Sequence, residues 1–289
     1  MNLPLRLHLL LFPPGCWHCR RLMNPFARQH PGFPYLCEAC DGALGWRDPE
    51  FSCRACGRIT AEPHRLRCPA CAAERIALDR VWGACHYRDP VRHWVLGLKY
   101  YRHDPLARMM GDLLARSIQT GGLTEDVDWV VPVPLHPSRV RRRGFNQAHL
   151  LAHHALAGLR RRGRPAPPPR TDLLQRHKKT RPQVEIAPAE RYPNVADAFS
   201  LAEPPALQAG WRGWIHRAAA RPAPANGNSA GGNGAGGNGA GEASRRAIEG
   251  RHILLVDDVM TTGATLNACA RTLKAAGARR VDALVLARA

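Results

Sequence analysis

The stretch Ile253-Leu-Leu-Val-Asp-Asp-Val-Met-Thr-Thr-Gly-Ala-Thr265 decides the fold of this 289-residue chain. Its first four residues are apolar and mostly branched, which is typical of a strand buried on both faces of a parallel sheet. Charge ends this run, so we expect Asp257 and Asp258 at the carboxyl end of the strand. A small hydroxyl-rich turn follows, and apolar residues then recur at helical spacing up to a stop at Gly277.

A strand, a tight turn and a helix start in this order are typical of a phosphate site. In open α/β sheets, ligands bind beyond the carboxyl ends of the strands, and N–H groups at a helix start attract phosphate. Gly263 lets the backbone approach an anion. The two acids repel a bare phosphate, so they suit the hydroxyls of a ribose or a magnesium ion held through water. Taken singly, the acids could be a solvated strand end and the turn an ordinary helix cap.

All thirteen positions together resemble the phosphoribosyl pyrophosphate (PRPP) signature of type I phosphoribosyltransferases. The resemblance implies that the acids hold the ribose hydroxyls, that the turn holds the 5′-phosphate, and that Mg²⁺ accompanies PRPP. The residues that it assigns to PRPP binding are Asp257, Asp258, Thr261, Thr262, Gly263, Ala264 and Thr265.

Eight of the ten cysteines form four Cys-x-x-Cys pairs in the first quarter of the chain. A two-residue gap lets both thiolates of a turn face one ion, and two such turns complete the tetrahedral Cys₄ shell that zinc prefers. Without an evident export signal, the pairs indicate metal thiolates in a reducing cytosol. Sequential pairing predicts two closed, structural zinc sites, and crossed pairing stays open. The ligands are Cys16, Cys19, Cys37 and Cys40, followed by Cys53, Cys56, Cys68 and Cys71.

Composition divides the chain into parts. We expect a short amphipathic helix at 1–15, a double zinc-ribbon domain at 16–75, and an α/β domain at 81–289 with a parallel sheet and helices on both faces. The metal sites and the PRPP site therefore belong to different domains. An insertion at about 202–250 should be disordered, because its centre is almost entirely Gly, Asn, Ala and Pro. No apolar run approaches the ~18 residues of a membrane span. This favours a cytoplasmic protein, with peripheral association at the inner membrane as an alternative.

A second motif, Val131-Pro-Val-Pro-Leu-His-Pro-Ser-Arg139, leaves another buried strand and leads into an arginine cluster and Gly144-Phe-Asn-Gln147. Arginine binds phosphate oxygens in a bidentate manner. If the two strands are neighbours, the two loops face one cleft. With Leu98-Lys-Tyr100, Thr180-Arg-Pro-Gln183 and the cysteines, this motif resembles the ComF/GntX family. These are competence-associated proteins with a zinc ribbon and a phosphoribosyltransferase domain.

Resemblance to phosphoribosyltransferases implies a pyrophosphate loop at Leu135, His136, Ser138 and Arg139. It also places a hood that selects the acceptor around residues 99–103. The remaining residues of the second motif are candidates for contact with an anion or a nucleic acid, namely Arg141, Arg142, Arg143, Asn146 and Gln147.

The net charge of +19 requires an anionic partner such as a nucleic acid, a nucleotide or pyrophosphate, unless it is a solvated basic surface. The first functional hypothesis is transfer of a phosphoribosyl group from PRPP to an unidentified acceptor. Positioning and neutralised pyrophosphate would supply the catalysis without a dedicated nucleophile. The alternative is a non-catalytic protein that handles transforming single-stranded DNA, with DNA-uptake proteins as partners and the PRPP site as a sensor or relic.

Overall fold

The structure is a computed structural model. The expected helix at 1–15 lies almost wholly outside the residues that it describes, and so does most of the expected insertion. No helix in the described part of the chain is long and apolar enough to cross a membrane. The described residues are 14–23, 35–48, 50–63, 66–72, 76–100, 104–121, 126–181, 186–187, 190–202 and 239–289.

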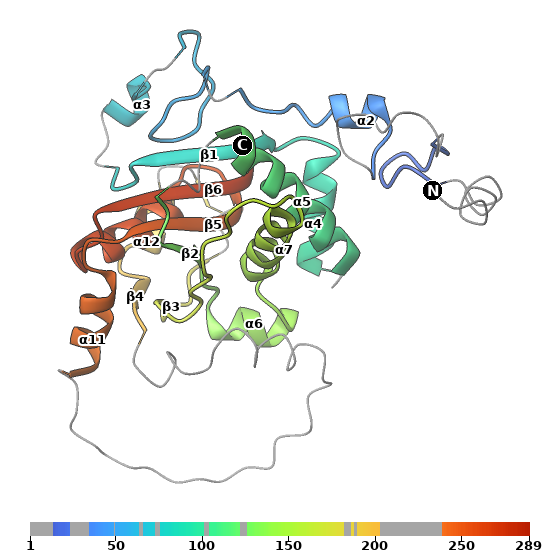
Figure 1. The fold of residues 1–289 in the computed structure, drawn as a ribbon. Helices are drawn as coiled ribbons and strands as arrows, with labels where there is room; N and C mark the ends of the chain where they lie inside the picture. The colour runs from blue at the N-terminus through green and yellow to red at the C-terminus, as the bar shows by residue number, and fades with distance from the viewer. Residues whose placement is uncertain are drawn as a thin grey trace, which may run out of the picture.

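Within the described residues, four strands form a central sheet in the order β1-β6-β5-β2 (Figure 1). Every neighbouring pair is parallel, so the carboxyl ends of the strands share one edge. β2 lies at the side of the sheet, as Pro132 and Pro134 predict, because proline cannot donate to a strand ladder. The strands are β1 (Arg80–His86), β2 (Trp129–Pro132), β5 (His252–Met260) and β6 (Arg280–Arg288).

The apolar run of β5 is buried on both faces of the sheet, which confirms the prediction. Leu254 and Val256 pack in one hydrophobic core, and Ile253 and Leu255 pack in the other. Full burial of each such side chain contributes about 1.5–3 kcal/mol. The first core is covered by α4 (Val91–Tyr100), α5 (Asp104–Gly121) and α7 (Gln147–Arg161), and the second by α12 (Ala264–Ala275).

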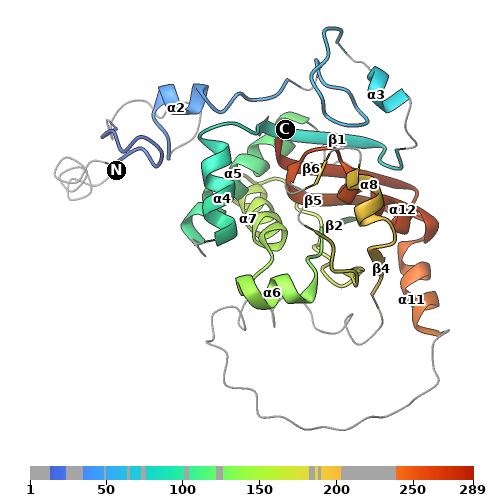
Figure 2. The same cartoon turned by 180° about the vertical axis from the view of Figure 1, so that it is seen from behind.

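Smaller elements complete the second face, and Figure 2 shows α8 and α12 there, in front of the sheet. The antiparallel pair β3–β4 lies next to them, and Thr272 of α12 donates to the Phe199 carbonyl at 3.4 Å. The remaining elements are α2 (Glu38–Gly42), α3 (Pro69–Ala72), α6 (Pro137–Arg143), β3 (Leu174–Arg176), α8 (Arg191–Val195), β4 (Phe199–Leu201) and α11 (Gly239–Ile248).

Helix α11 corrects the expected insertion at 202–250. Residues 203–238 lie outside the described part, but residues 239–248 are helical and belong to the fold. Ile248 is fully buried in the second core, and the Ser244 hydroxyl donates to the Ala202 carbonyl at 3.1 Å. The insertion therefore ends before α11 and not at about residue 250, because an amphipathic helix follows the Gly-Asn repeats.

The cysteine region, expected as a double zinc-ribbon domain at 16–75, packs against the α/β domain. Cys16 and Cys40 pack in the first hydrophobic core, together with Trp94 of α4. The four cysteines from Cys53 onward pack in the second core, together with Ile253 of β5. Each cysteine set therefore joins the core on a different face of one sheet.

The chain between and within the two cysteine sets also runs along the free side of β1. The N–H of Arg47 donates to the Ala84 carbonyl at 3.2 Å, and the N–H of Val81 donates to the Arg54 carbonyl at 2.6 Å. On the opposite side of the sheet, the N–H of Val130 donates to the Pro168 carbonyl at 3.1 Å. Backbone from other segments thus covers part of both outer strands.

Candidate functional site

The acid pair lies within β5, near the carboxyl end where the sequence predicts it, and two more strand residues follow Asp258. β6 continues to pair with β5 as far as Met260, whereas the pairing of β2 with β5 ends at Val256. Asp257 and Asp258 therefore occupy the part of β5 that extends past its shorter neighbour. The side-chain oxygens of both acids accept from the next backbone N–H, at 2.8 Å and 2.7 Å.

Negative charge at the acid pair is only partly balanced. Burial and the charge of Asp258 raise the pKa of Asp257 to about 8. The ammonium of Lys99, at the end of α4, lies 2.9 Å from Asp258 Oδ2. Burial alone would lower the pKa of Lys99, but the attraction of Asp258 and Asp257 raises it. The site thus favours additional positive charge or hydrogen-bond donors.

The turn after β5 is fixed by contacts with α12 and α8. Gly263 has φ of 90°, and an added Cβ there would collide with the thioether of Met260. The Gly263 carbonyl accepts from the N–H of Asn267 at 2.8 Å, so α12 starts directly at the turn. The Tyr192 hydroxyl of α8 donates to the Thr262 carbonyl at 3.2 Å. The first N–H groups of α12 therefore lie close to the acid pair, as an anion site requires.

The second motif reaches the same edge of the sheet, because β2 and β5 are neighbours. The N–H of Val133 donates to the Val256 carbonyl at 2.9 Å, directly before the acids. Of the expected pyrophosphate loop, Leu135 and His136 are loop residues, whereas Ser138 and Arg139 lie in the first turn of α6.

His136 caps the start of α6, which explains why Ser138 and Arg139 are helical and not part of the loop. Its Nδ1 accepts from the N–H of Ser138 at 3.2 Å and lies 2.7 Å from the Ser138 hydroxyl. Pro137 favours a helix start, because it lacks an N–H and its φ is preset. The Arg139 guanidinium donates to the Thr180 carbonyl at 2.8 Å, which ties α6 to the segment after β3.

Asn146 and Gln147 are buried, and their amides are used within the protein. Asn146 caps α7, where it accepts from the N–H of Ala148 at 3.0 Å and donates to the Val133 carbonyl at 2.9 Å. Gln147 accepts from Arg143 at 3.0 Å. Asn146 thus has a structural role as a helix cap, and contact of the two amides with an anion or a nucleic acid stays a prediction.

Arginines from two elements approach the acids. Arg141 and Arg142 are exposed, whereas Arg143 is partly buried and attracted by Asp258. Burial and the charge of Arg139 lower the pKa of Arg176, while Asp257 attracts it. Sequence reasoning assigned neither Lys99 nor Arg176 to the PRPP site. For Lys99, the available signal in the sequence was the family motif Leu98-Lys-Tyr100. Residues 101–103 of the expected hood lie outside the described part.

The cysteines form two sets that can each hold a metal ion. In each set the four sulfur atoms lie within 4.8 Å of one another, and the pairing is sequential. Burial raises the pKa of Cys16, but hydrogen bonds from the backbone of Cys37, Cys19 and His18 outweigh it and lower the pKa to about 6. In the same set, burial and hydrogen bonds with Cys37, Cys19 and Cys16 raise the pKa of Cys40, so before metal binds the thiolate is favoured at Cys16. Four thiolates fill a tetrahedral shell, which fits structural zinc. The sets are Cys16, Cys19, Cys37 and Cys40, and Cys53, Cys56, Cys68 and Cys71.

Metal analysis of the purified protein should give two zinc ions per chain, because both sets are complete and closed. Chelation should remove both ions and release the thiols for titration, which serves as the matched measurement. A value below one zinc per chain, with all eight thiols reactive from the outset, would contradict the assignment.

Comparison with known proteins agrees with this geometry. The family profile described as a phosphoribosyl transferase domain matches residues 226–289. DNA utilization protein YhgH of Escherichia coli O6:H1 is 26% identical over 97% of this chain and 99% of its own length. Competence protein F of Haemophilus influenzae is 24% identical over 95% of this chain and 96% of its own length. The crystal structure of TT1426 from Thermus thermophilus covers 62% of this chain and 72% of its own, with 21% identity and a TM-score of 0.26, which is too low to compare the folds.

Proposed function

Because this chain is a member of the ComF family of competence and DNA-utilization proteins, we propose that it binds PRPP with Mg²⁺ and transfers the phosphoribosyl group to an acceptor. The observation that carries the proposal is the acid pair of β5, followed at once by the Gly263 turn and the start of α12. Eight thiolates at ligand spacing also favour a reducing environment, so we place the reaction in the cytoplasm.

Each part of PRPP has a chemical counterpart at this edge of the sheet. The carboxylates of Asp257 and Asp258 can accept hydrogen bonds from the two ribose hydroxyls, and charge strengthens these bonds. The N–H groups at the start of α12 and the hydroxyls of Thr261 and Thr265 can hold the 5′-phosphate. Arg143 and Lys99 lie close enough to the acids to attract the pyrophosphate group.

The acid pair also fits a divalent cation. Carboxylate oxygens are the ligands that Mg²⁺ prefers. The pKa of Asp257 is raised by burial and by the charge of Asp258, so a bound cation would favour its ionised form. Asp257 and Asp258 would hold the ion, directly or through water. When bound, Mg²⁺ would neutralise the charge that develops on the departing pyrophosphate.

The chain's own residues would act mainly by positioning and by charge. Cleavage of the bond to pyrophosphate leaves an electron-poor ribose, and the nearby carboxylates favour this charge distribution. Guanidinium and ammonium groups stabilise the leaving group, so no covalent intermediate with the protein is needed. The acceptor then forms its bond to the same ribose carbon.

The experiment that tests this proposal is a titration with PRPP and Mg²⁺, followed by an assay for released pyrophosphate with nucleobases and with DNA as acceptors. Binding with acceptor-dependent release supports the transferase. Binding without release supports the alternative, a DNA-handling protein with a PRPP sensor. Absence of PRPP binding rejects the function proposed for this site.

PRPP affinity should rise with pH from about pH 7 to about pH 9. The pKa of Asp257 in the free protein is raised to about 8, so below that value the carboxyl is mostly protonated and must lose its proton when PRPP and Mg²⁺ bind. Affinity should therefore increase up to about tenfold per pH unit below the pKa and level off above it. Calorimetric titration across this range measures the effect.

The matched control for the pH profile is Asp257→Asn, which cannot ionise. Its affinity should be low and nearly independent of pH in the same range, because the phosphate groups of PRPP have a second pKa of about 6 and are already ionised there. A wild-type profile as flat as that of the variant would contradict the assignment of Asp257.

The alternative function has one observation in its favour. Arg141 and Arg142 are exposed on α6, the helix that also carries the half-buried Arg143. Such exposed guanidinium groups suit a phosphate backbone. Together with the names of the relatives, this supports single-stranded DNA as a partner that the same edge of the sheet could meet.

A further inference from the structure

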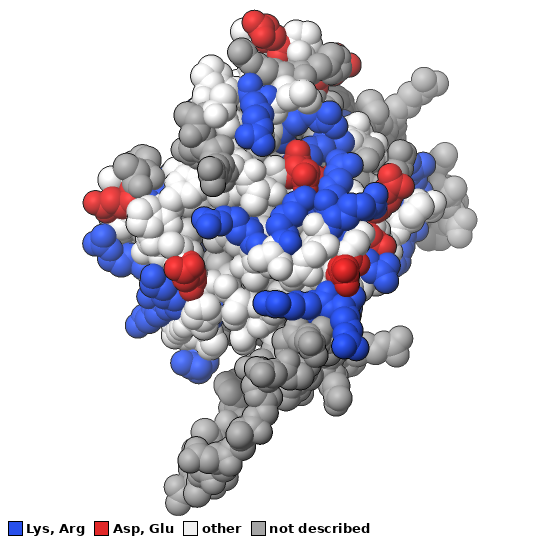
Figure 3. Space-filling model, turned by 90° about the vertical axis from the view of Figure 1, so that its left-hand side faces the viewer, with Lys and Arg blue, Asp and Glu red and all other residues white. Residues whose placement is uncertain are grey.

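The amino-terminal edge of the sheet, opposite the acid pair, carries a second group of basic residues. Figure 3 faces this edge and shows Lys and Arg side chains gathered across its middle, with acidic side chains between them. Five cations line two hollows at this edge and come from four parts of the fold. They are Arg54 and Arg67 from the second cysteine set, Arg80 from β1, Lys274 from α12 and Arg280 from β6.

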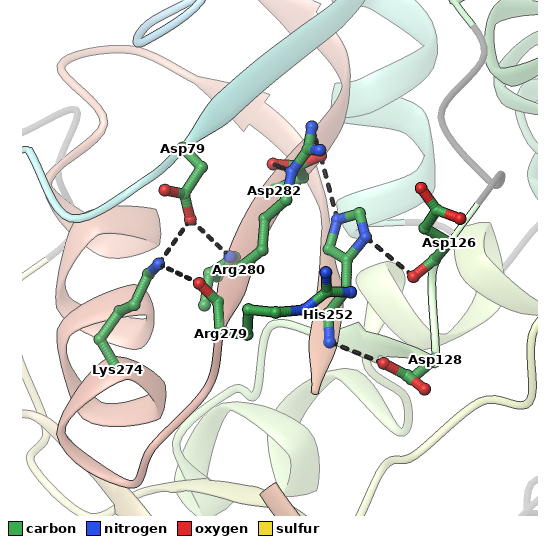
Figure 4. A network of polar contacts seen from close by, with 9 residues as sticks. Asp79, Asp126, Asp128, His252, Lys274, Arg279, Arg280 and Asp282 are labelled. Carbon is green, nitrogen blue, oxygen red and sulfur yellow. Dashed lines mark hydrogen bonds and ion pairs between the residues drawn. The ribbon is translucent and has the colours of Figure 1, made fainter. Parts of the chain in front are cut away.

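A polar network holds this edge rigid (Figure 4). Asp282 is almost fully buried and accepts from Arg280 at 3.0 Å and 2.8 Å, while His252 Nε2 lies 3.1 Å from its Oδ2. The Lys274 ammonium lies 2.7 Å from Asp79, which also accepts from the N–H of Val281. These pairs fix Arg280 and Lys274 in place and partly neutralise their charge.

Arg54 and Arg80 are not neutralised in this way. Arg80 lies over the ring of Trp82 at 5.2 Å. Burial and the positive charge of Arg54 lower the pKa of Arg80, against the weaker attraction of Asp282. Within the described residues, neither guanidinium forms an ion pair. Two like charges so close together favour an anion between or beside them.

Two hollows open at these arginines, and Arg54 borders both. The first has a volume of about 370 Å³ and is lined by Arg54, Arg80 and Trp82, with Ser52 and Thr120 as hydroxyl donors and Glu50 as its acid. The second has a volume of about 530 Å³. Its cations are Arg54, Arg67, Lys274 and Arg280, and its acid is Asp79, which already pairs with Lys274.

We propose that the two hollows form a second phosphate-binding site, which takes a ligand with at least two phosphate groups, one in each hollow. Guanidinium groups bind phosphate oxygens in a bidentate manner, and Arg54 stands where it can contact both groups. The phosphates belong to a nucleic-acid backbone or to a free polyphosphate compound, since both offer the same chemistry. The site is separate from the acid pair, so it does not rest on the function proposed above.

The test compares the full-length wild type with Arg54→Gln/Arg80→Gln, using a fluorescein-labelled 20-mer of deoxythymidine and inorganic tripolyphosphate as probes. The control is Arg92→Gln, an exposed arginine on α4, which follows the carboxyl end of β1. Asp257→Asn/Asp258→Asn is included to separate this site from the acid pair. Metal content and thermal melting verify that each variant is folded, and Arg67→Gln is a milder variant of the same site.

The double arginine variant should bind at least one probe about tenfold or more weakly, while Arg92→Gln binds as the wild type does. The same loss should appear when the arginine changes are made together with Asp257→Asn/Asp258→Asn, because the two sites are separate. An effect confined to the oligonucleotide identifies a nucleic-acid backbone, and one confined to tripolyphosphate identifies a free phosphate compound. Equal binding of both probes by wild type and the double arginine variant overturns the proposal. So does an equal loss in Arg92→Gln, which would mean diffuse attraction by net charge.

Discussion

Replacing Asp257 and Asp258 together with Asn should lower the affinity for PRPP by about a hundredfold or more. Each charge-assisted hydrogen bond contributes roughly 1.5–3 kcal/mol, and ~1.4 kcal/mol corresponds to a factor of ten. Asn keeps the size of the side chain and the oxygen that accepts from the next backbone N–H. The fold should survive with a lower melting temperature, because Lys99 loses its ion pair with Asp258. The ribose or cation contacts lose their charge. Calorimetric titration with PRPP and Mg²⁺ measures the loss.

The matched control is Asp126→Asn at the opposite edge of the sheet. Asp126 is exposed and has φ of 77°, a conformation that asparagine tolerates well, so its replacement should change neither folding nor PRPP affinity. Equal PRPP affinity in wild type and the Asp257/Asp258 variant would reject the ribose assignment. Loss of oligonucleotide binding in that variant, with PRPP affinity retained, would favour the DNA-handling alternative.

Cys53→Ser should lower both the thermal stability and the PRPP affinity. Structural zinc contributes roughly 10–16 kcal/mol to the folding of small modules, so loss of one ligand should lower the melting temperature by about 10 °C or more. Cys53 is fully buried in the same core as β5 and α12. Arg288 donates to the Cys56 carbonyl at 3.0 Å and to the Met260 carbonyl at 3.1 Å, next to the Gly263 turn.

Cys19→Ser is the control for this prediction, because Cys19 is exposed and its set joins the other core. It should remove one metal ion and lower stability, but PRPP affinity should change by less than about threefold, since that set packs on the face of the sheet away from α12. For both variants, thermal melting measures the stability, metal analysis the metal content, and calorimetric titration the PRPP affinity. Equal PRPP affinity in wild type and Cys53→Ser would show that the second metal site is independent of the turn.

The sequence was sufficient wherever a local pattern carries the information. The apolar run at Ile253 predicts a strand buried on both sides, and Gly277 ends α12 with φ of 93° as expected. The cysteine spacing predicts two sets, and the structure settles the pairing as sequential. In each case the signal lies within a few residues, so no knowledge of distant contacts is needed.

Other features depend on contacts between distant segments and could not be predicted in this way. The length of β5 beyond Val256 is set by β6, which continues alongside it. The ion pair of Lys99 with Asp258 joins residues that are far apart in the chain. The role of Asn146 as a cap could not be predicted either, because a helix cap and an anion contact use the same side chain, and its burial is known only from the fold.

The backbone that runs along β1 has a further consequence for the fate of the protein without metal. An outer strand with unpaired N–H and carbonyl groups is a template for pairing with another chain. Here the backbone of Arg47 and Arg54 forms hydrogen bonds with the backbone of β1. The positions of both residues depend on the two cysteine sets. Metal ions held by the two sets would therefore protect the protein against aggregation. Their removal would leave a strand able to add to a second molecule, and yield and solubility in the cell would then follow the supply of metal.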